Sequence, residues 1–196
     1  MTLSTNTENN PEDEYLVKRV LSGDTHAFAT IIKSTERLVA QIIFKMVADN
    51  EVRKDLAQDV YLKAFRSLSG FKFQSKLSTW IARITYTTCL TYLDKRKVTE
   101  FPMINKEYAD DAMGEPGDDV ELSFFKQELT GILSKEIEML PPLYKTVITL
   151  YHNEELSYSE IAQITELPEG TLKSYLFRAR KTLKDNLLKK YNRDAL

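Results

Sequence analysis

Hydrophobic positions recur every three or four residues through most of the first hundred residues, the spacing of one face of an α-helix. Asp24 and Thr25 are good capping residues at the start of the first such run. Ser69 and Gly70 interrupt the pattern after the second run. The pattern therefore predicts three helices, which extend from Thr25 to Val47, from Glu51 to Leu68 and from Ser78 to Lys97.

The helical spacing fails after Val98 and resumes at Val120. The intervening stretch is rich in acidic residues, Pro and Gly, a composition that cannot form a packed core. We therefore predict an all-α fold, with two small helical domains joined by a flexible acidic linker. The predicted boundaries are a disordered N-terminal tail at 1–11, a first domain at 12–98, the linker at 99–120 and a second domain at 121–196.

Start signals in the second domain predict a helix-turn-helix. Pro142 suits the first turn of one helix, and Ser157 with Glu160 three residues later fits a capping box that opens the next. Residues 165–167 then form a short turn, and Pro168 starts a last helix. Two helices separated by a turn of about three residues match the DNA-binding motif.

The charge distribution favours the same interpretation, although the net charge of the chain is −2. Residues 168–193 contain eight basic and two acidic residues, a charge of +6, whereas residues 99–140 contain three basic and eleven acidic ones, a charge of −8. The last helix needs an apolar face for its own core, and Leu172, Leu176, Ala179 and Leu183 supply it. Its other face offers donors to phosphates and base edges.

The length, the overall composition and the targeting signals limit which classes of protein are possible. The chain has 196 residues, of which 42% are hydrophobic and 29% charged. No apolar run is long enough for a membrane span, the N-terminus lacks a signal peptide, and Cys89 is the single cysteine. These features predict a cytoplasmic protein without membrane insertion.

At this point the chain resembles sigma factors of the extracytoplasmic-function type, which direct bacterial RNA polymerase to promoters. The resemblance to the fourth domain of that family lies in residues 156–162 (LSYSEIA), 168–174 (PEGTLKS) and 178–180 (RAR). The resemblance to its second domain lies in residues 55–65 (DLAQDVYLKAF) and 77–84 (LSTWIARI). Both sets in this order are highly specific, and they cover nearly everything outside the linker and tails.

The resemblance implies a protein that binds core RNA polymerase and promoter DNA, both duplex and single-stranded, and that commonly has an anti-sigma partner. In that family the polymerase clamp meets the matching positions of the second helix, so the resemblance implies a clamp-binding face there. These positions, at i, i+3, i+4 and i+7, lie together on the helix surface. That face comprises Asp55, Gln58, Asp59 and Leu62.

The loop from Ser69 to Lys76 mixes aromatic and basic residues, as unpaired bases and their phosphates require. Trp80, on the apolar stripe, is expected to be core. The residues predicted to bind the melted minus-ten element are Lys72, Phe73, Lys76, Thr79, Arg83, Tyr86 and Thr87.

The duplex minus-thirty-five element would be read by the last helix and the start of the helix before it. The predicted contacts are Tyr158, Thr171, Lys173, Ser174, Phe177, Arg178, Arg180 and Lys181. Three positions depart from the family pattern, which often has Asn at Thr87, Gly at Glu166 and Arg at Tyr175. These departures put the commonest DNA preference in doubt.

Two alternatives stay open at this stage. A stand-alone repressor or activator would have the same C-terminal motif, but it would not explain the aromatic and basic loop or the Asp55 face. An enzyme would need a constellation that His26, His152 and Cys89 do not form, since none shows a catalytic or metal-binding spacing. No phosphate-binding loop is present, so we expect no cofactor, no metal site and no catalytic residue.

Overall fold

The computed structural model describes residues 10–100 and 123–191, and every regular element within them is helical. The all-α prediction is confirmed. The elements are α1 (Pro11–Leu21), α2 (Thr25–Met46), α3 (Asn50–Ser67), the 3₁₀ turn η1 (Leu68–Gly70), α4 (Leu77–Glu100), α5 (Ser123–Glu138), α6 (Pro142–His152), α7 (Tyr158–Thr165) and α8 (Glu169–Tyr191).

Local signals explain where most of these helices begin. The Asp24 carboxylate accepts hydrogen bonds from the backbone N–H groups of His26 and Ala27 at the start of α2. Ser157 and Glu160 form the predicted capping box at the start of α7. The three helices expected in the first domain are found within a few residues of their predicted bounds.

Helix α1 was missed by the hydrophobic pattern, which placed the disordered tail up to residue 11. Its start signals are nevertheless present, because the Asn10 side chain accepts from the N–H of Glu12 and Pro11 occupies the first helical turn. Val17 and Val20 are its buried residues. The linker predicted at 99–120 lies almost entirely outside the described residues, so the four domain boundaries stay predictions.

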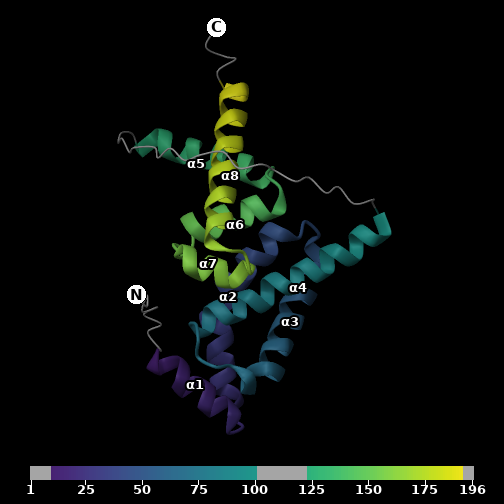
Figure 1. Ribbon diagram of the computed structural model, residues 1–196, viewed down its shortest axis with the longest axis vertical. Helices are drawn as coiled ribbons and strands as arrows, with labels where there is room; N and C mark the ends of the chain where they lie inside the picture. The colour runs from purple at the N-terminus through teal and green to yellow at the C-terminus, as the bar shows by residue number, and fades with distance from the viewer. Residues whose placement is uncertain (1–9, 101–122, 192–196) are drawn as a thin grey trace.

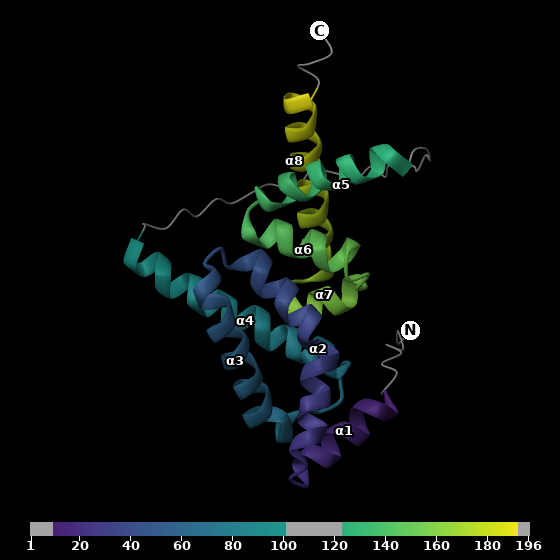
Figure 2. The same cartoon turned by 180° about the vertical axis from the view of Figure 1, so that it is seen from behind.

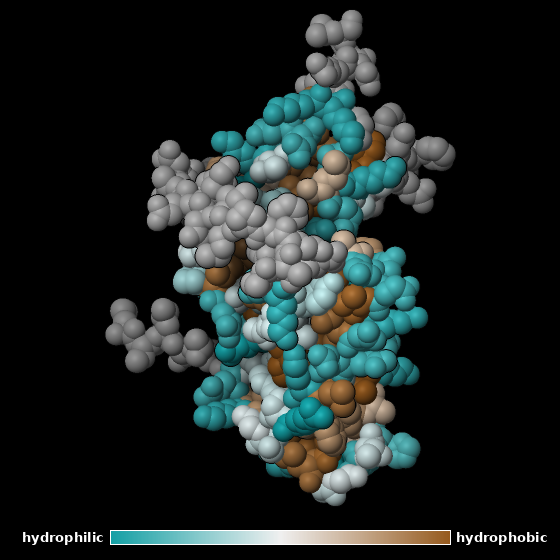
Figure 3. All heavy atoms as spheres, turned by 90° about the vertical axis from the view of Figure 1, so that its right-hand side faces the viewer, coloured by the Kyte–Doolittle hydropathy of each residue, from teal (hydrophilic) through white to brown (hydrophobic). Residues whose placement is uncertain are grey.

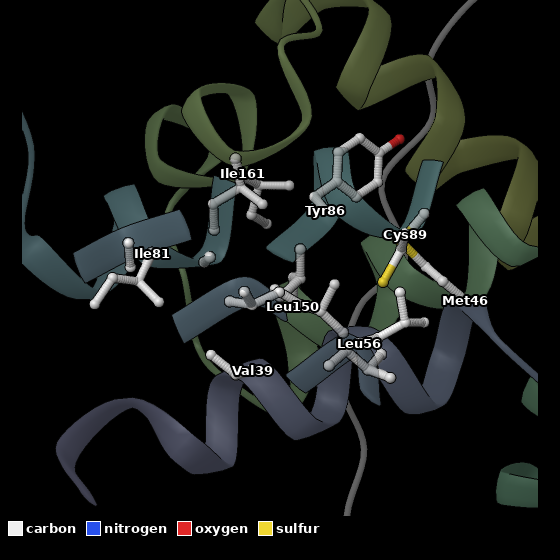
Figure 4. Close-up of a cluster of buried hydrophobic side chains, with 14 of the residues drawn as sticks. Val39, Met46, Leu56, Ile81, Tyr86, Cys89, Leu150 and Ile161 are labelled. Carbon is white, nitrogen blue, oxygen red and sulfur yellow. The ribbon is translucent and has the colours of Figure 1, made fainter. Parts of the chain in front are cut away.

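The helices form two groups that pack directly on each other. α1 to α4 make one bundle and α5 to α8 the other, and α7 lies against α4 while α6 lies against α2 (Figures 1 and 2). Buried side chains from both groups belong to one hydrophobic cluster. Figure 4 shows part of it, with labelled side chains from α2, α3, α4, α6 and α7: Val39, Met46, Leu56, Ile81, Tyr86, Cys89, Leu150 and Ile161.

Hydropathy along the described helices gives no candidate membrane span: each is too short or too polar to cross a bilayer.

Candidate polymerase and nucleic-acid interfaces

The predicted clamp face lies on α3, opposite the side of that helix that enters the core. Leu56, Val60 and Ala64 are buried on the core side. Leu62 is 51% exposed and its neighbour Phe65 48%. Figure 3, seen from the side on which α3 lies, shows apolar patches between polar side chains over the lower half of the surface. The four predicted clamp residues Asp55, Gln58, Asp59 and Leu62 are all exposed.

The aromatic residues of the loop before α4 form a small stack rather than a free surface. Phe71 is buried, and its ring centroid lies 4.7 Å from that of Phe73 and 5.1 Å from that of Trp80. Trp80 is half-buried against the core, so the expectation of a core residue holds in part. Phe73 adopts a left-handed backbone conformation with φ of 55°, which turns the chain toward α4.

A cavity of about 310 Å³ opens beside this loop. Three predicted minus-ten residues, Lys72, Thr79 and Arg83, line this cavity. Gln163 on α7 also lines it. The other lining residues are Gly70, Phe71, Gln74, Ser75 and Trp80. Sequence reasoning missed Gln163, because only the packing of α7 on α4 brings it to the loop.

Three of the predicted minus-ten residues, Tyr86, Thr79 and Thr87, are wholly or partly buried. Tyr86 is 4% exposed, and this burial raises the pKa of its hydroxyl to about 12. Thr79 is buried as well. Thr87 is half-buried, and its hydroxyl donates to the backbone carbonyls of Arg83 and Ile84 at 3.0 and 3.1 Å. Tyr86 and Thr79 therefore do not face solvent in this arrangement.

Two of the three cations on this surface, Lys76 and Arg83, are paired with carboxylates of α7 and the turn that follows it. Lys76 Nζ lies 2.9 Å from an oxygen of Glu160, and Arg83 Nε donates to Glu166 at 2.7 Å. Partial burial alone would raise the pKa of Glu160, but the bonds from Lys76 and Ser157 hold it below its usual value.

The helix-turn-helix has the predicted geometry. α7 ends at Thr165, Glu166 turns the chain in a left-handed conformation with φ of 59°, and α8 begins at Glu169. Leu172, Leu176 and Ala179 are buried as predicted, and Leu183 is half-buried. Among the predicted contacts, Lys173, Phe177 and Lys181 are exposed, while Tyr158, Thr171, Ser174, Arg178 and Arg180 are half-buried.

Aromatic rings beneath two of these cations hold them in place. Arg180 lies over the ring of Tyr151, 5.3 Å from its centroid, and Lys173 lies 5.6 Å from the ring centroid of Tyr158. The two tyrosine rings stack on each other at 5.0 Å. Sequence reasoning missed Tyr151 as a supporting residue, although its position at the end of an amphipathic helix was visible.

His152 completes this group. Its Nε2 lies 3.2 Å from a guanidinium nitrogen of Arg180, and a guanidinium can only donate. His152 is therefore neutral in this contact, with its proton on Nδ1. Partial burial and the charge of Arg180 both lower the pKa of His152.

Tyr175, one of the departures from the family pattern, has a packing role. It is half-buried, and its ring lies 5.9 Å from that of Tyr144 on α6. A Tyr–Tyr contact between α6 and α8 thus occupies the position where the pattern often has Arg.

Comparison with known proteins decides between the two kinds of DNA-binding protein considered above. Residues 31–99 match the family description "Sigma-70 region 2", and residues 130–183 match "Sigma-70, region 4". The ECF RNA polymerase sigma-E factor of Haemophilus influenzae is 33% identical over 180 residues, covering 89% of this chain and 95% of the relative. The chain belongs to the extracytoplasmic-function sigma factors of RNA polymerase.

Two further relatives agree. The RNA polymerase sigma-H factor of Pseudomonas aeruginosa is 31% identical, over 94% of this chain and 97% of the relative. The ECF RNA polymerase sigma factor SigW of Bacillus subtilis is 29% identical, over 87% of this chain and 94% of the relative. The matches span both helical groups, so the relatives resemble this sigma factor in both region 2 and region 4.

Solved structures show the same fold. CnrH, in complex with the cytosolic domain of CnrY, matches with a TM-score of 0.62 at 18% identity, over 90% of this chain and 97% of that one. The sigma factor RpoE of Bartonella quintana, in complex with the anti-sigma factor NepR, matches with a TM-score of 0.59 at 22% identity, over 83% and 96%.

The chain is thus a promoter-recognising RNA polymerase sigma factor, and sigma factors are initiation factors rather than catalysts. Cys89 is fully buried, and burial raises the pKa of its thiol to about 12. A thiol of this kind is not a nucleophile at neutral pH.

Proposed function

We propose that this sigma factor divides promoter recognition between its two helical groups. The face of α3 formed by Asp55, Gln58, Asp59 and Leu62 binds the polymerase clamp, the loop before α4 captures the melted minus-ten strand, and α8 reads the minus-thirty-five duplex. The support for the first step is an exposed acidic face that also exposes a leucine, which a solvated helix surface does not require.

The observation that carries the minus-ten assignment is the cavity beside the loop. Lys72 and Arg83 supply positive charge at its wall, and Trp80 supplies an aromatic surface. Unpaired bases bind by stacking on aromatic rings while cations neutralise the backbone. Phe71 and Trp80 both line the cavity, and the ring of Phe73 packs against that of Phe71.

The proposed duplex reader is the exposed face of α8. Lys173 lies in its second turn and Arg180 near its middle, and both are oriented by tyrosine rings. A recognition helix contacts base edges through its N-terminal part and phosphates further along. Lys173 is therefore placed to meet a base edge, and Arg180 to meet a phosphate.

The experiment is transcription by core polymerase with this sigma factor carrying Lys72→Ala. The matched control is Lys33→Ala, an exposed lysine on α2 that does not line the cavity. Loss of one contact to a single-stranded phosphate should reduce the salt dependence of open-complex formation by about 0.7 in logarithmic slope. The control should behave as wild type.

Both duplex and pre-melted promoter templates from a genomic library are required. The wild-type factor should stimulate initiation on a subset of duplex templates, and Lys72→Ala should lower initiation on both kinds. Equal initiation with and without the wild-type factor would overturn the proposal. A deficit shared by Lys33→Ala would overturn the assignment of the cavity.

We also propose an anti-sigma partner and a cytoplasmic location, with no cofactor. The support for the partner is the fold shared with CnrH and RpoE, whose structures contain CnrY and the anti-sigma factor NepR. The support for the location is that a sigma factor acts where polymerase and DNA are.

A further inference from the structure

The surface that should bind melted DNA is covered by another part of the same chain. α7 packs on α4 (Figures 1 and 2). Glu160 pairs with Lys76, and Glu166 pairs with Arg83. Gln163, between these two carboxylates in the sequence, forms a wall of the cavity. Tyr86, another minus-ten candidate, is buried in the cluster that also holds Ile161 of α7 (Figure 4).

Two more ion pairs join the same two groups of helices. Arg37 on α2 lies 3.2 Å from a carboxylate oxygen of Glu154 and also donates to the carbonyl of Asn153 at 3.3 Å. Lys45 on α2 pairs with Glu138 at the end of α5. In each of these four pairs the cation comes from the first group and the carboxylate from the second. The C-terminal group therefore presents an acidic surface to the first one, although α8 is basic.

Carboxylates at these positions can replace phosphates. A guanidinium recognises both with the same planar arrangement of donors, and Arg83 directs Nε and a terminal nitrogen to one oxygen of Glu166. An ammonium such as that of Lys76 pairs with either group as a point charge. DNA and α7 cannot occupy Lys76 and Arg83 at the same time.

The left-handed backbone conformation of Glu166 indicates that its side chain has a functional role. A φ of 59° favours glycine or asparagine, and glutamate there is strained. Glycine would relieve the strain but would leave Arg83 without this partner. The turn of the helix-turn-helix thus combines an unfavourable backbone conformation with a charge aimed at the predicted minus-ten surface.

We propose that α7 is an intramolecular competitor of the melted DNA strand. Glu160 and Glu166 neutralise Lys76 and Arg83 in the free sigma factor, and the two helical groups separate before the minus-ten strand binds. The competition with DNA rests on the proposed function of the cavity. The closed arrangement, in which the two helical groups pack on each other, does not depend on that proposal. Removal of the two carboxylate charges should open the molecule and make Lys76 and Arg83 accessible to DNA.

The test uses the full chain carrying Glu160→Gln and Glu166→Asn. Glutamine keeps the acceptor of the capping box, and asparagine tolerates the left-handed conformation, so both changes remove charge with little damage to the local fold. The matched control carries Glu155→Asn and Glu12→Gln. Glu155 also has a left-handed backbone, with φ of 52°, and both control residues are exposed.

The first readout is the distance between spin labels at Lys54→Cys on α3 and Lys184→Cys on α8, both exposed positions. The buried thiol of Cys89 does not react. Wild type and the control should give one short distance at low salt. The double variant should give a longer and broader distribution. Unchanged distances in the double variant, or equal opening in the control, would overturn the proposal.

The second readout is the affinity for a mixed-sequence single-stranded DNA oligonucleotide of twelve nucleotides. The double variant should bind roughly tenfold tighter than the control, which has the same net charge. Equal affinity would overturn the competition. Neither readout includes polymerase, so failure here leaves the transcription test intact, and failure of that test leaves the distance result intact.

Discussion

At the scale of single residues, the contact between His152 and Arg180 links the protonation of His152 to a cation of the proposed duplex-reading helix. Arg180 lies over Tyr151 and beside the imidazole, and burial together with this positive charge lowers the pKa of His152. Protonation of His152 would place two positive charges side by side. The neutral imidazole therefore helps to hold Arg180 in its half-buried position.

The pKa of His152 should consequently lie below the ordinary value of about 6.5. Arg180→Ala should raise it only part of the way, because the burial remains. In the wild-type protein, a lowered pKa of His152 means that the folded state binds fewer protons than the unfolded state at pH values between the two pKa values. The free energy of unfolding should therefore fall as the pH drops from about 6.5 through the pKa of His152 in the folded state. Titration of the imidazole by NMR measures this, with His26 as the second resonance. A pKa of His152 at or above 6.5 would contradict the geometry.

Lys173 and Arg178 should differ in what they recognise. They are five residues apart, which is about 140° around the helix axis, so they cannot share a contact. Lys173→Ala should relax sequence preference at one or two positions of the minus-thirty-five element, at a cost of about 1–3 kcal/mol in discrimination. Arg178→Ala should weaken binding to all sequences and flatten the salt dependence by about one unit of slope.

The measurement is a set of promoter variants titrated with the sigma factor and core polymerase at several salt concentrations. Lys33→Ala again serves as a control for loss of one positive charge. A change in preference with Arg178→Ala, combined with a uniform loss with Lys173→Ala, would reverse the two roles.

At the scale of elements, the N-terminus of α4 depends on a residue far away in the sequence. A carboxylate oxygen of Asp13 on α1 accepts from the backbone N–H of Leu77 at 2.9 Å, which satisfies a donor that the start of α4 would otherwise leave unpaired. Leu77 follows directly on the loop that carries Phe73 and Lys76. α1 therefore fixes the end of the loop that we propose captures the minus-ten strand.

Asp13→Ala should cost about 1 kcal/mol, the usual loss when a helix cap is removed. Asp13→Asn keeps an acceptor oxygen and should recover most of it. If the cap also positions the loop, Asp13→Ala should lower initiation on a pre-melted promoter while duplex minus-thirty-five binding stays unchanged. Glu12→Gln, in the same first turn but exposed, is the control. Equal losses of stability and of initiation for Asp13→Ala and Glu12→Gln would mean that only the negative charge in the first turn of α1 matters, and not the bond from Leu77 to Asp13.

The cap at the start of α4 also shows what the sequence could not predict. The capping box of Ser157 and Glu160 was predictable because its partners are three residues apart. The cap on α4 joins residues 64 positions apart, and no local pattern carries that information. The same applies to the cavity, where Lys72 and Arg83 were predicted but Gln163 was not. The burial of Tyr86 and Thr79 likewise depends on packing between elements.

At the scale of the whole molecule, charges that attract across the interface surround a shared apolar core. The carboxylate pairs were not visible in the sequence, because the acidic linker dominated the charge pattern between the two helical groups. Only the fold shows that Glu138, Glu154, Glu160 and Glu166 face cations of the first group. Exposed pairs of this kind contribute little one by one, but several together bias an equilibrium between closed and open arrangements.

Acidification should open the molecule. Glu160 faces Lys76 across the interface and Ser157 on its own cap, while Glu138 faces Lys45 on α2 and Lys145 on α6. Partial burial acts to raise the pKa of each carboxyl group, but these partners outweigh it and lower the pKa. Only the part of each lowering that comes from Lys76 or Lys45 across the interface stabilises the closed arrangement. That part is fully present above the ordinary Glu pKa of about 4.3 and is lost as the pH falls through the lowered values.

The label distance between α3 and α8, measured from pH 7 down to pH 3, should lengthen below about pH 4.3 while far-ultraviolet circular dichroism still reports folded helices. In a double variant that carries Glu138→Gln and Glu160→Gln, the label distance should already be longer at pH 7. The pH dependence of that distance should also flatten. Glu155→Gln, which removes an exposed carboxylate outside the four pairs, should keep the wild-type profile. A distance that changes only together with the loss of helicity would show that acid unfolds the protein rather than separating its two helical groups.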